Sequence, residues 1–234
     1  MTLASTLPRL KGSLIASAGT IVFGMEDGTV SIFGLIFGVA ATTTSSVAVL
    51  VAGASGAAAA AVSMMAGAYL DAETNQDAMR AGQLRLRSDL ALDPIVIADQ
   101  LSDRLAAAGL TFEQSTALRD AVSHNPEALR GVLVALQTPP EAPLKPLEQA
   151  LWMLLADFLS AAVPTLPFIF LPIAKARFVA AAATITLLAV LGLGRARIGG
   201  RSISRTITET VSMGIAAALA GVAIGVLINR CFGG

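Results

Sequence analysis

The sequence predicts an all-α, polytopic membrane protein with five transmembrane helices and a polar helical insert between the second and the third. Two observations carry this prediction. Of the 234 residues 55% are hydrophobic, and the mean hydropathy is +0.73, well above that of an ordinary soluble domain. The hydrophobic residues also gather in five runs, more than the core helices of one soluble protein would need, and these cover residues 14–41, 47–70, 150–171, 178–193 and 211–228.

The first run resembles a signal peptide only superficially. Arg9 and Lys11 precede it, but it is too long for a signal sequence and contains Glu26 and Asp27. We therefore expect a retained first span.

The fourth run is the shortest of the five. It has 16 residues, fewer than the roughly 20 that usually cross a bilayer. Lys175, Arg177 and Arg195 at its ends could extend toward the membrane surfaces, which would allow so short a span.

The basic residues predict the orientation. Thirteen of the sixteen Lys and Arg side chains fall on one side of the membrane if the N-terminus is cytoplasmic, and only Lys175, Arg177 and Arg230 fall on the other. Because cytoplasmic loops are rich in Lys and Arg, we expect the N-terminus and the insert in the cytoplasm. The abundance of Ala, Gly and Arg favours a bacterial plasma membrane, whereas in a eukaryote the same chain would lie in a vacuolar membrane.

The polar insert, residues 71–147, separates transmembrane helices one and two (1–70) from helices three to five (148–234). Three helix-start signals predict three short helices after an extension of span two: Asp93 with Pro94, Thr111 with Gln114, and Asn125 with Pro126. Gly109 is expected to end the first of them, and residues 138–146, with four prolines, form a linker. The 11 acidic against 7 basic residues of the insert are most simply a solvated surface.

Ionisable side chains inside the predicted spans indicate a functional site, since each costs about 2.5 to 3.5 kcal/mol at the bilayer centre. Span one holds Glu26 and Asp27, and span three holds Asp157. At 1.5 Å rise per residue, Asp27 lies about 22 Å, Asp157 about 21 Å and Met64 about 25 Å below the outer end of its span. Two carboxylates and a thioether from three helices are therefore predicted near one depth, with prolines bending span three.

Carboxylate oxygen combined with methionine sulfur suits a divalent transition metal such as Fe(II) or Mn(II). Buried carboxylates also bind protons, because loss of water disfavours the charged form. Competition between the two is the physical basis of a proton-coupled metal antiporter. Two simpler interpretations stay open: Glu26 and Asp27 as a polar pair in a water-filled vestibule, and Met64 as a packing residue.

Pairs of small residues four positions apart favour close helix packing. Span one carries two such pairs beside its acids, which makes it a candidate for both a dimer seam and the translocation path. The pairs are Gly24 and Gly28, Gly34 and Gly38, Gly56 and Ala60, and Gly221 and Gly225.

Signatures of a soluble enzyme or of a resident cofactor are absent from the sequence. The single histidine, His124, precedes a helix start and is expected to be solvated, and no nucleophile with a base and an orienting group can be assembled. The glycines at 192–200 follow no strand, so a phosphate-binding loop is a poor interpretation. Cys231 is the only cysteine, which rules out an internal disulfide.

Three segments resemble the vacuolar iron transporter family. GMEDGTVSIFGLIFGVAA around Asp27 is similar to the first-helix signature, SMMAGAYLDAETNQD around Met64 to the second-helix pattern, and DFLSAAVPTLPF to the proline-containing third helix. The resemblance implies a homodimer of five-helix protomers that moves Fe(II), and often Mn(II), out of the cytosol in exchange for protons. It assigns the aspartate and methionine of the membrane site to Asp27 and Met64.

The chain departs from this family in two respects. Ala68 stands where the family has an intramembrane glutamate, and Asp71, one turn further, or Asp157 would have to compensate. The insert also lacks most of the glutamates and methionines with which the family binds metal there, so we expect a divergent member whose insert is structural or at best a weak metal collector. The predicted metal site then comprises Glu26, Asp27, Met64, Asp157 and Asp71; the alternative is a non-transporting scaffold or sensor that retains the transporter fold.

Overall fold

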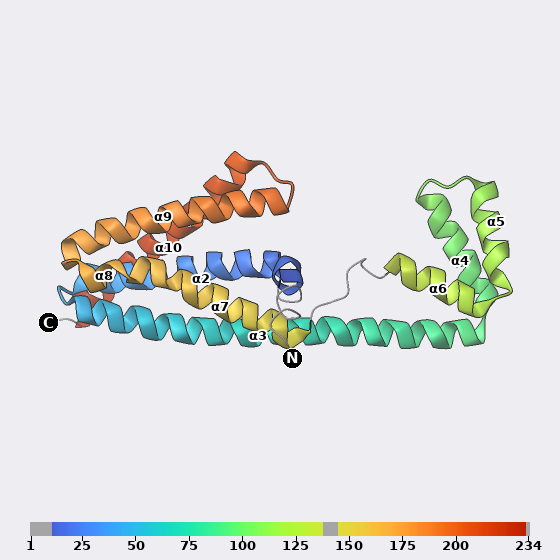
Figure 1. Cartoon of the computed structure of the whole chain (residues 1–234), viewed down its shortest axis with the longest axis horizontal. Coiled ribbons are helices and arrows are strands. Elements are labelled where there is room, and N and C mark those ends of the chain that lie inside the picture. Colours follow the sequence, from blue (N-terminus) through green and yellow to red (C-terminus); the bar gives the residue numbers. More distant parts are fainter. Residues whose placement is uncertain (1–10, 138–144, 233–234) are drawn as a thin grey trace. The chain divides into compact units, whose positions relative to one another are not determined.

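The computed structural model describes residues 11–137 and 145–232, except for the side chains of residues 90 and 91 (Figure 1). All regular secondary structure within this part of the chain is helical, which confirms the predicted all-α class. The helices are α2 (Ala18–Thr42), α3 (Ser46–Leu92), α4 (Pro94–Ala107), α5 (Phe112–Ser123), α6 (Pro126–Gln137), α7 (Pro146–Thr165), α8 (Pro167–Phe170), α9 (Ile173–Ile198) and α10 (Ile203–Phe232).

Five stretches are long and apolar enough to cross a membrane, as predicted. They are α2, α9, α10, residues Ser46–Asp89 of α3, and Pro146–Phe170, which joins α7 to the short α8. Pro164 lies inside α7, and Pro167 begins α8 one residue after α7 has ended. Span three is therefore interrupted at Leu166, between the two prolines that the sequence predicts to bend it.

The fourth span is longer than the sequence predicts. It runs for 26 residues, from Ile173 to Ile198, rather than 16, because the helix continues through the basic residues that flank its apolar centre. Two of these make contacts with α2 and the residue that follows it. Arg177 donates hydrogen bonds to the carbonyl oxygens of Ala40 and Thr43 at the end of α2, and Arg195 contacts a carboxylate of α2.

The chain divides into two compact units, with the boundary inside α3, after Ala72. In the unit that contains α4, α5 and α6, the predicted start signals are all present. Asp93 accepts hydrogen bonds from the backbone of the first turn of α4, Thr111 and Gln114 form the reciprocal capping box, and Asn125 accepts from the amide of Ala128. Gly109 has φ +107°, a conformation that favours glycine, and follows the end of α4.

Apolar side chains of α4, α5 and α6 bury one another in a small core: Ala98, Leu101, Val122, Leu129 and Leu133. Most of the proline-rich linker predicted at 138–146 lies outside the described residues, although Pro146 begins α7.

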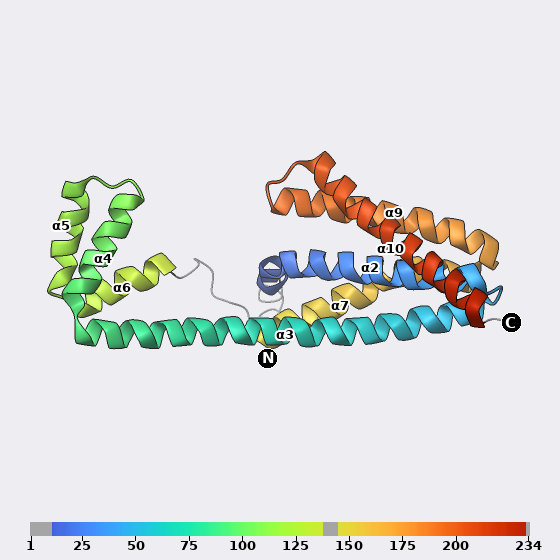
Figure 2. The same ribbon diagram turned by 180° about the vertical axis from the view of Figure 1, so that it is seen from behind.

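In the other unit, α2 is the central helix. It packs extensively against α7 and α10 and also contacts α9 (Figures 1 and 2). The core of this unit unites α2, α3, α7, α8 and α9, and its buried members include Ile36, Val49, Ala161, Phe168 and Ala180.

The glycines of α2 allow close contacts with other helices of the same chain. A Cβ atom at Gly38 would lie 2.7 Å from the carbonyl oxygen of Gly221, and one at Gly34 would lie 2.9 Å from that of Ala217, so α2 and α10 meet backbone to backbone. Gly24 and Gly28 face α7 in the same way. These glycines therefore serve contacts inside the protomer, and the position of span one at a dimer seam stays a prediction.

Candidate intramembrane cation site

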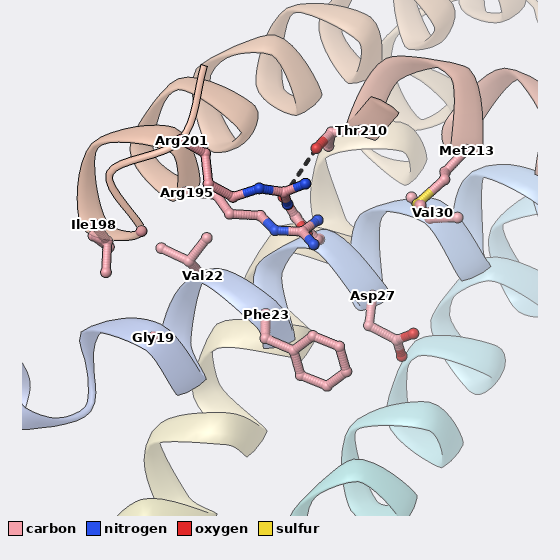
Figure 3. Close-up of a pocket in the computed structure, with 12 residues that line it drawn as sticks. Gly19, Val22, Phe23, Asp27, Val30, Arg195, Ile198, Arg201, Thr210 and Met213 are labelled. Atoms are coloured by element: carbon pink, nitrogen blue, oxygen red, sulfur yellow. Dashed lines mark hydrogen bonds and ion pairs between the residues drawn. The ribbon is translucent and has the colours of Figure 1, made fainter. Parts of the chain in front are cut away.

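A cavity of about 490 Å³ lies between α2, α9 and α10 (Figure 3). We call it the charged cavity, because four ionisable side chains line it: Glu26, Asp27, Arg195 and Arg201. Thr210 and Met213 of α10 complete its polar and thioether lining. Charged groups inside a membrane bundle are costly and occur mainly where ions or substrates pass, so this cavity is the first candidate for a site.

Glu26 is held from two sides. Its Oε2 accepts a hydrogen bond from Nη1 of Arg195 at 3.2 Å, and its Oε1 accepts one from Oγ1 of Thr210 at 3.2 Å. The Glu26 side chain is only 13% exposed. This carboxylate therefore joins α2 to α9 and α10, and its charge is balanced by the guanidinium group.

Asp27 has a different environment from its neighbour. In Figure 3 its carboxylate points away from the guanidinium groups of Arg195 and Arg201. It lines the charged cavity and is half-buried, and it has no hydrogen-bond partner among the described residues. An unpaired carboxylate at this position is free to bind a cation.

Asp157 of α7 lies against the same turn of α2. It is fully buried, and neither of its carboxylate oxygens has a hydrogen-bond partner within the described part of the chain. A Cβ atom at Gly28 would lie 2.7 Å from its Oδ1, and its charge interacts with that of Asp27. Carboxylates from two helices are thus placed together, one of them in a position where a charge without a partner is strongly unfavourable.

The other two predicted ligands lie elsewhere. Met64 of α3 is half-buried and Asp71 of α3 is exposed, and neither lines the charged cavity. Among the described residues, no group of three or more His, Cys, Asp and Glu side chains is arranged to hold a metal ion. The structure therefore places Asp27 and Asp157 on turns of α2 and α7 that contact each other, holds Glu26 with Arg195 and Thr210, and leaves Met64 and Asp71 outside the charged cavity.

Sequence reasoning missed the contribution of α9 and α10. It attributed the arginines between the fourth and fifth runs to membrane orientation alone, whereas three of them have carboxylate partners. Arg195 contacts Glu26, while Nη2 of Arg201 and Nε of Arg205 contact Glu209 at 3.1 and 2.9 Å. The four-residue spacing of Arg205 and Glu209 was a sequence signal for that ion pair. Nothing in the sequence indicated the pair of Arg195 and Glu26.

Met213 was also missed. The Met213 side chain lines the charged cavity together with Asp27 (Figure 3). The sequence predicts that Met64 would supply the thioether near Asp27. Met213 falls eight residues after Arg205 in the predicted fifth span, where a methionine is more often a packing residue, so its sequence position carried no distinguishing signal.

Five candidate membrane spans, with a carboxylate-lined cavity between three of them, define a multi-pass membrane protein of the ion-transporter class. A model of the VIT family matches residues 18–226, and the chain belongs to this family. This confirms the family resemblance that the sequence motifs indicated.

Plant relatives support the same assignment. Vacuolar iron transporter 1 of Tulipa gesneriana is 29% identical over 183 residues, which cover 77% of this chain and 74% of the relative. Vacuolar iron transporter 1 of Eucalyptus grandis is 27% identical over 179 residues, covering 76% and 72% of the two chains. The protein of the same name in Arabidopsis thaliana is 26% identical over 179 residues, covering 76% and 71%. These relatives identify a family of metal transporters, which agrees with the expectation that the chain is not an enzyme.

Proposed function

We propose that this protein carries Fe(II) or Mn(II) out of the cytosol in exchange for protons. The observation that carries the proposal is Asp157, a fully buried carboxylate without a hydrogen-bond partner in the described residues, placed beside the unpaired Asp27. Two adjacent carboxylates bind a divalent cation well, because together they supply two negative charges and up to four oxygen ligands. The printed names of the plant relatives support iron as the cargo.

Proton coupling follows from the same two groups. A carboxylate that holds a proton cannot at the same time coordinate a metal ion, so the two occupants exclude each other. A site that exchanges them on opposite sides of the membrane couples metal movement in one direction to proton movement in the other. The proposed ligands are Asp27 and Asp157; Glu26, Met64 and Asp71 are supported by the sequence pattern alone.

A second copy of the chain is also part of the proposal. The described donor set of one protomer is small for Fe(II) or Mn(II), and the resemblance to the family implies a homodimer. Exposed apolar residues on the membrane-spanning helices, such as Phe178 and Leu219, would face lipid or a second protomer.

Flux into proteoliposomes tests the function directly. Metal uptake under an imposed pH gradient is compared between the native chain, Asp27→Asn and Asp157→Asn, with Asp103→Asn in the exposed part of the insert as the matched control. We expect gradient-dependent uptake of Mn(II) and Fe(II) in the native chain and the control, and at least a tenfold loss in the two membrane variants. Uptake that survives in both membrane variants would disprove the assigned site.

The alternative function is a membrane scaffold or sensor that retains the fold but transports nothing. The absence of a three-donor metal group among the described residues favours it. Folded native protein that shows no flux of either metal, at any imposed gradient, would establish this alternative over the transporter.

A further inference from the structure

The Arg195–Glu26 pair is an unusual feature of the charged cavity, because it places a fixed positive charge next to a proposed cation site. Arg195 stands in the last turn of α9, and its guanidinium group donates to Glu26 at 3.2 Å. The residue that follows Glu26 is Asp27, one of the two proposed cation ligands. A change in the charge of this pair therefore acts electrostatically on a cation bound at Asp27.

The charges around the site can be assigned one by one. Arg201 and Arg205 share the single carboxylate of Glu209, at 3.1 and 2.9 Å, and the excess positive charge of this group lies with Arg205, whose side chain is 77% exposed to solvent. Glu26 is balanced by Arg195. Asp27 and Asp157 have no basic partner in the described part of the chain, so they contribute two uncompensated negative charges, the number that a divalent cation neutralises.

We infer that Arg195 is a specificity-determining residue, which neutralises Glu26 and thereby keeps the charge of the site matched to a divalent rather than a trivalent cation. This inference rests on the proposed function. Without Arg195, the Glu26 carboxylate adds a third negative charge beside Asp27. Cations then bind more tightly and dissociate more slowly, and trivalent cations are favoured over divalent ones. Without Glu26, Arg195 is an unpaired positive charge that repels the cation.

The inference makes Glu26 a charge partner instead of a metal ligand. A ligand role predicts that loss of Glu26 weakens binding whether or not Arg195 is present. A purely structural role for the pair, joining α2 to α9 and α10, predicts that each single substitution destabilises the protein and weakens binding. Charge balance alone predicts effects of opposite sign from the two single substitutions and their cancellation in the double variant.

The test is a double-substitution cycle on the purified full chain. The Kd of Mn(II) is measured from the electron paramagnetic resonance of free Mn(II), and that of Tb(III) from its luminescence, for the native chain, Arg195→Gln, Glu26→Gln and the double variant. Arg205→Gln is the matched control, because it also removes an arginine from a glutamate but does not line the cavity. Arg195→Lys keeps the charge and should behave as the native chain.

We expect Arg195→Gln to bind Mn(II) on the order of tenfold more tightly and Tb(III) more tightly still, and Glu26→Gln to bind Mn(II) on the order of tenfold more weakly. The double variant should return to within about threefold of the native Kd. Weaker binding in both single variants, or a double variant as weak as Glu26→Gln, would overturn the inference while leaving the proposed function intact.

Two further outcomes are also decisive. If Arg195→Gln does not fold, the comparison of Glu26→Gln with the double variant decides: recovery of Mn(II) binding in the double variant supports the inference, and a double variant as weak as Glu26→Gln overturns it. A folded native chain that binds neither Mn(II) nor Fe(II) refutes the proposed function, and the inference fails with it.

Discussion

Replacing Gly28 with alanine is expected to force α2 away from α7 and to weaken metal binding. A Cβ atom at this position would lie 2.7 Å from Oδ1 of Asp157 and 2.7 Å from Oγ of Ser160, and closer still to the carbonyl oxygen of Asp157. Ordinary contacts of a carbon atom are about 3.5 to 4.0 Å, so the helices must separate by about 1 Å. Because Asp157 belongs to α7 and Asp27 to α2, the two carboxylates move apart when the helices separate.

The expected loss of stability follows from the overpacking of a close helix contact, which typically costs about 1 to 3 kcal/mol. At about 2 to 4 °C per kcal/mol for a chain of this size, the Tm in detergent should fall by about 2 to 12 °C. The Kd of Mn(II), measured on the same samples, should rise at least tenfold. The assays are differential scanning fluorimetry and Mn(II) titration.

Gly67→Ala is the matched control, because a Cβ atom at Gly67 would meet nothing within 4 Å and the residue lies inside the helix α3. Alanine is preferred to glycine in a helix by roughly 0.5 to 1 kcal/mol, so this variant should keep or raise the Tm. A Gly28→Ala protein with native Tm and native Mn(II) affinity would refute the close contact of α2 and α7 at the site.

Three further predictions concern the capping of α4, the surface charges of the insert and the orientation of the chain. Asp93→Ala removes the acceptor for the first turn of α4 and should destabilise the helices of the insert by about 0.5 to 2 kcal/mol in chemical denaturation followed by circular dichroism; an unchanged midpoint would contradict the capping role. Asp99→Asn breaks a half-exposed ion pair with Arg119, which keeps Asp120 as a second carboxylate partner, so the denaturation midpoint should change little; a large fall in the midpoint would contradict a surface role for this pair. Cys231, the only cysteine, is exposed near the end of α10, so a membrane-impermeant maleimide should label it in intact cells if the N-terminus is cytoplasmic. Labelling only after permeabilisation would reverse the predicted orientation.

Local signals in the sequence predicted the helices of the insert well. Asp93, the capping box of Thr111 and Gln114, and Asn125 act on backbone groups within three residues of themselves. Such interactions do not depend on the rest of the fold, so the residue types alone indicate them.

Helix ends in the membrane were predicted less well. The fourth helix begins at Ile173 instead of residue 178, and the fifth at Ile203 instead of 211. Hydropathy marks the part of a helix that suits lipid, whereas the backbone hydrogen bonds continue through adjacent polar residues. The number of spans was therefore predictable, and their lengths were not.

The sequence by itself determined the number of spans and the family, because apolar run length and short sequence motifs depend only on the local chain. Only the tertiary structure decided which side chains meet. It placed Asp157 against Gly28, Arg195 on Glu26, and Met213 rather than Met64 in the charged cavity. The physical reason is that depth along a helix axis leaves open both the rotation of each helix and the identity of its neighbours, and these are set by packing between residues far apart in the chain.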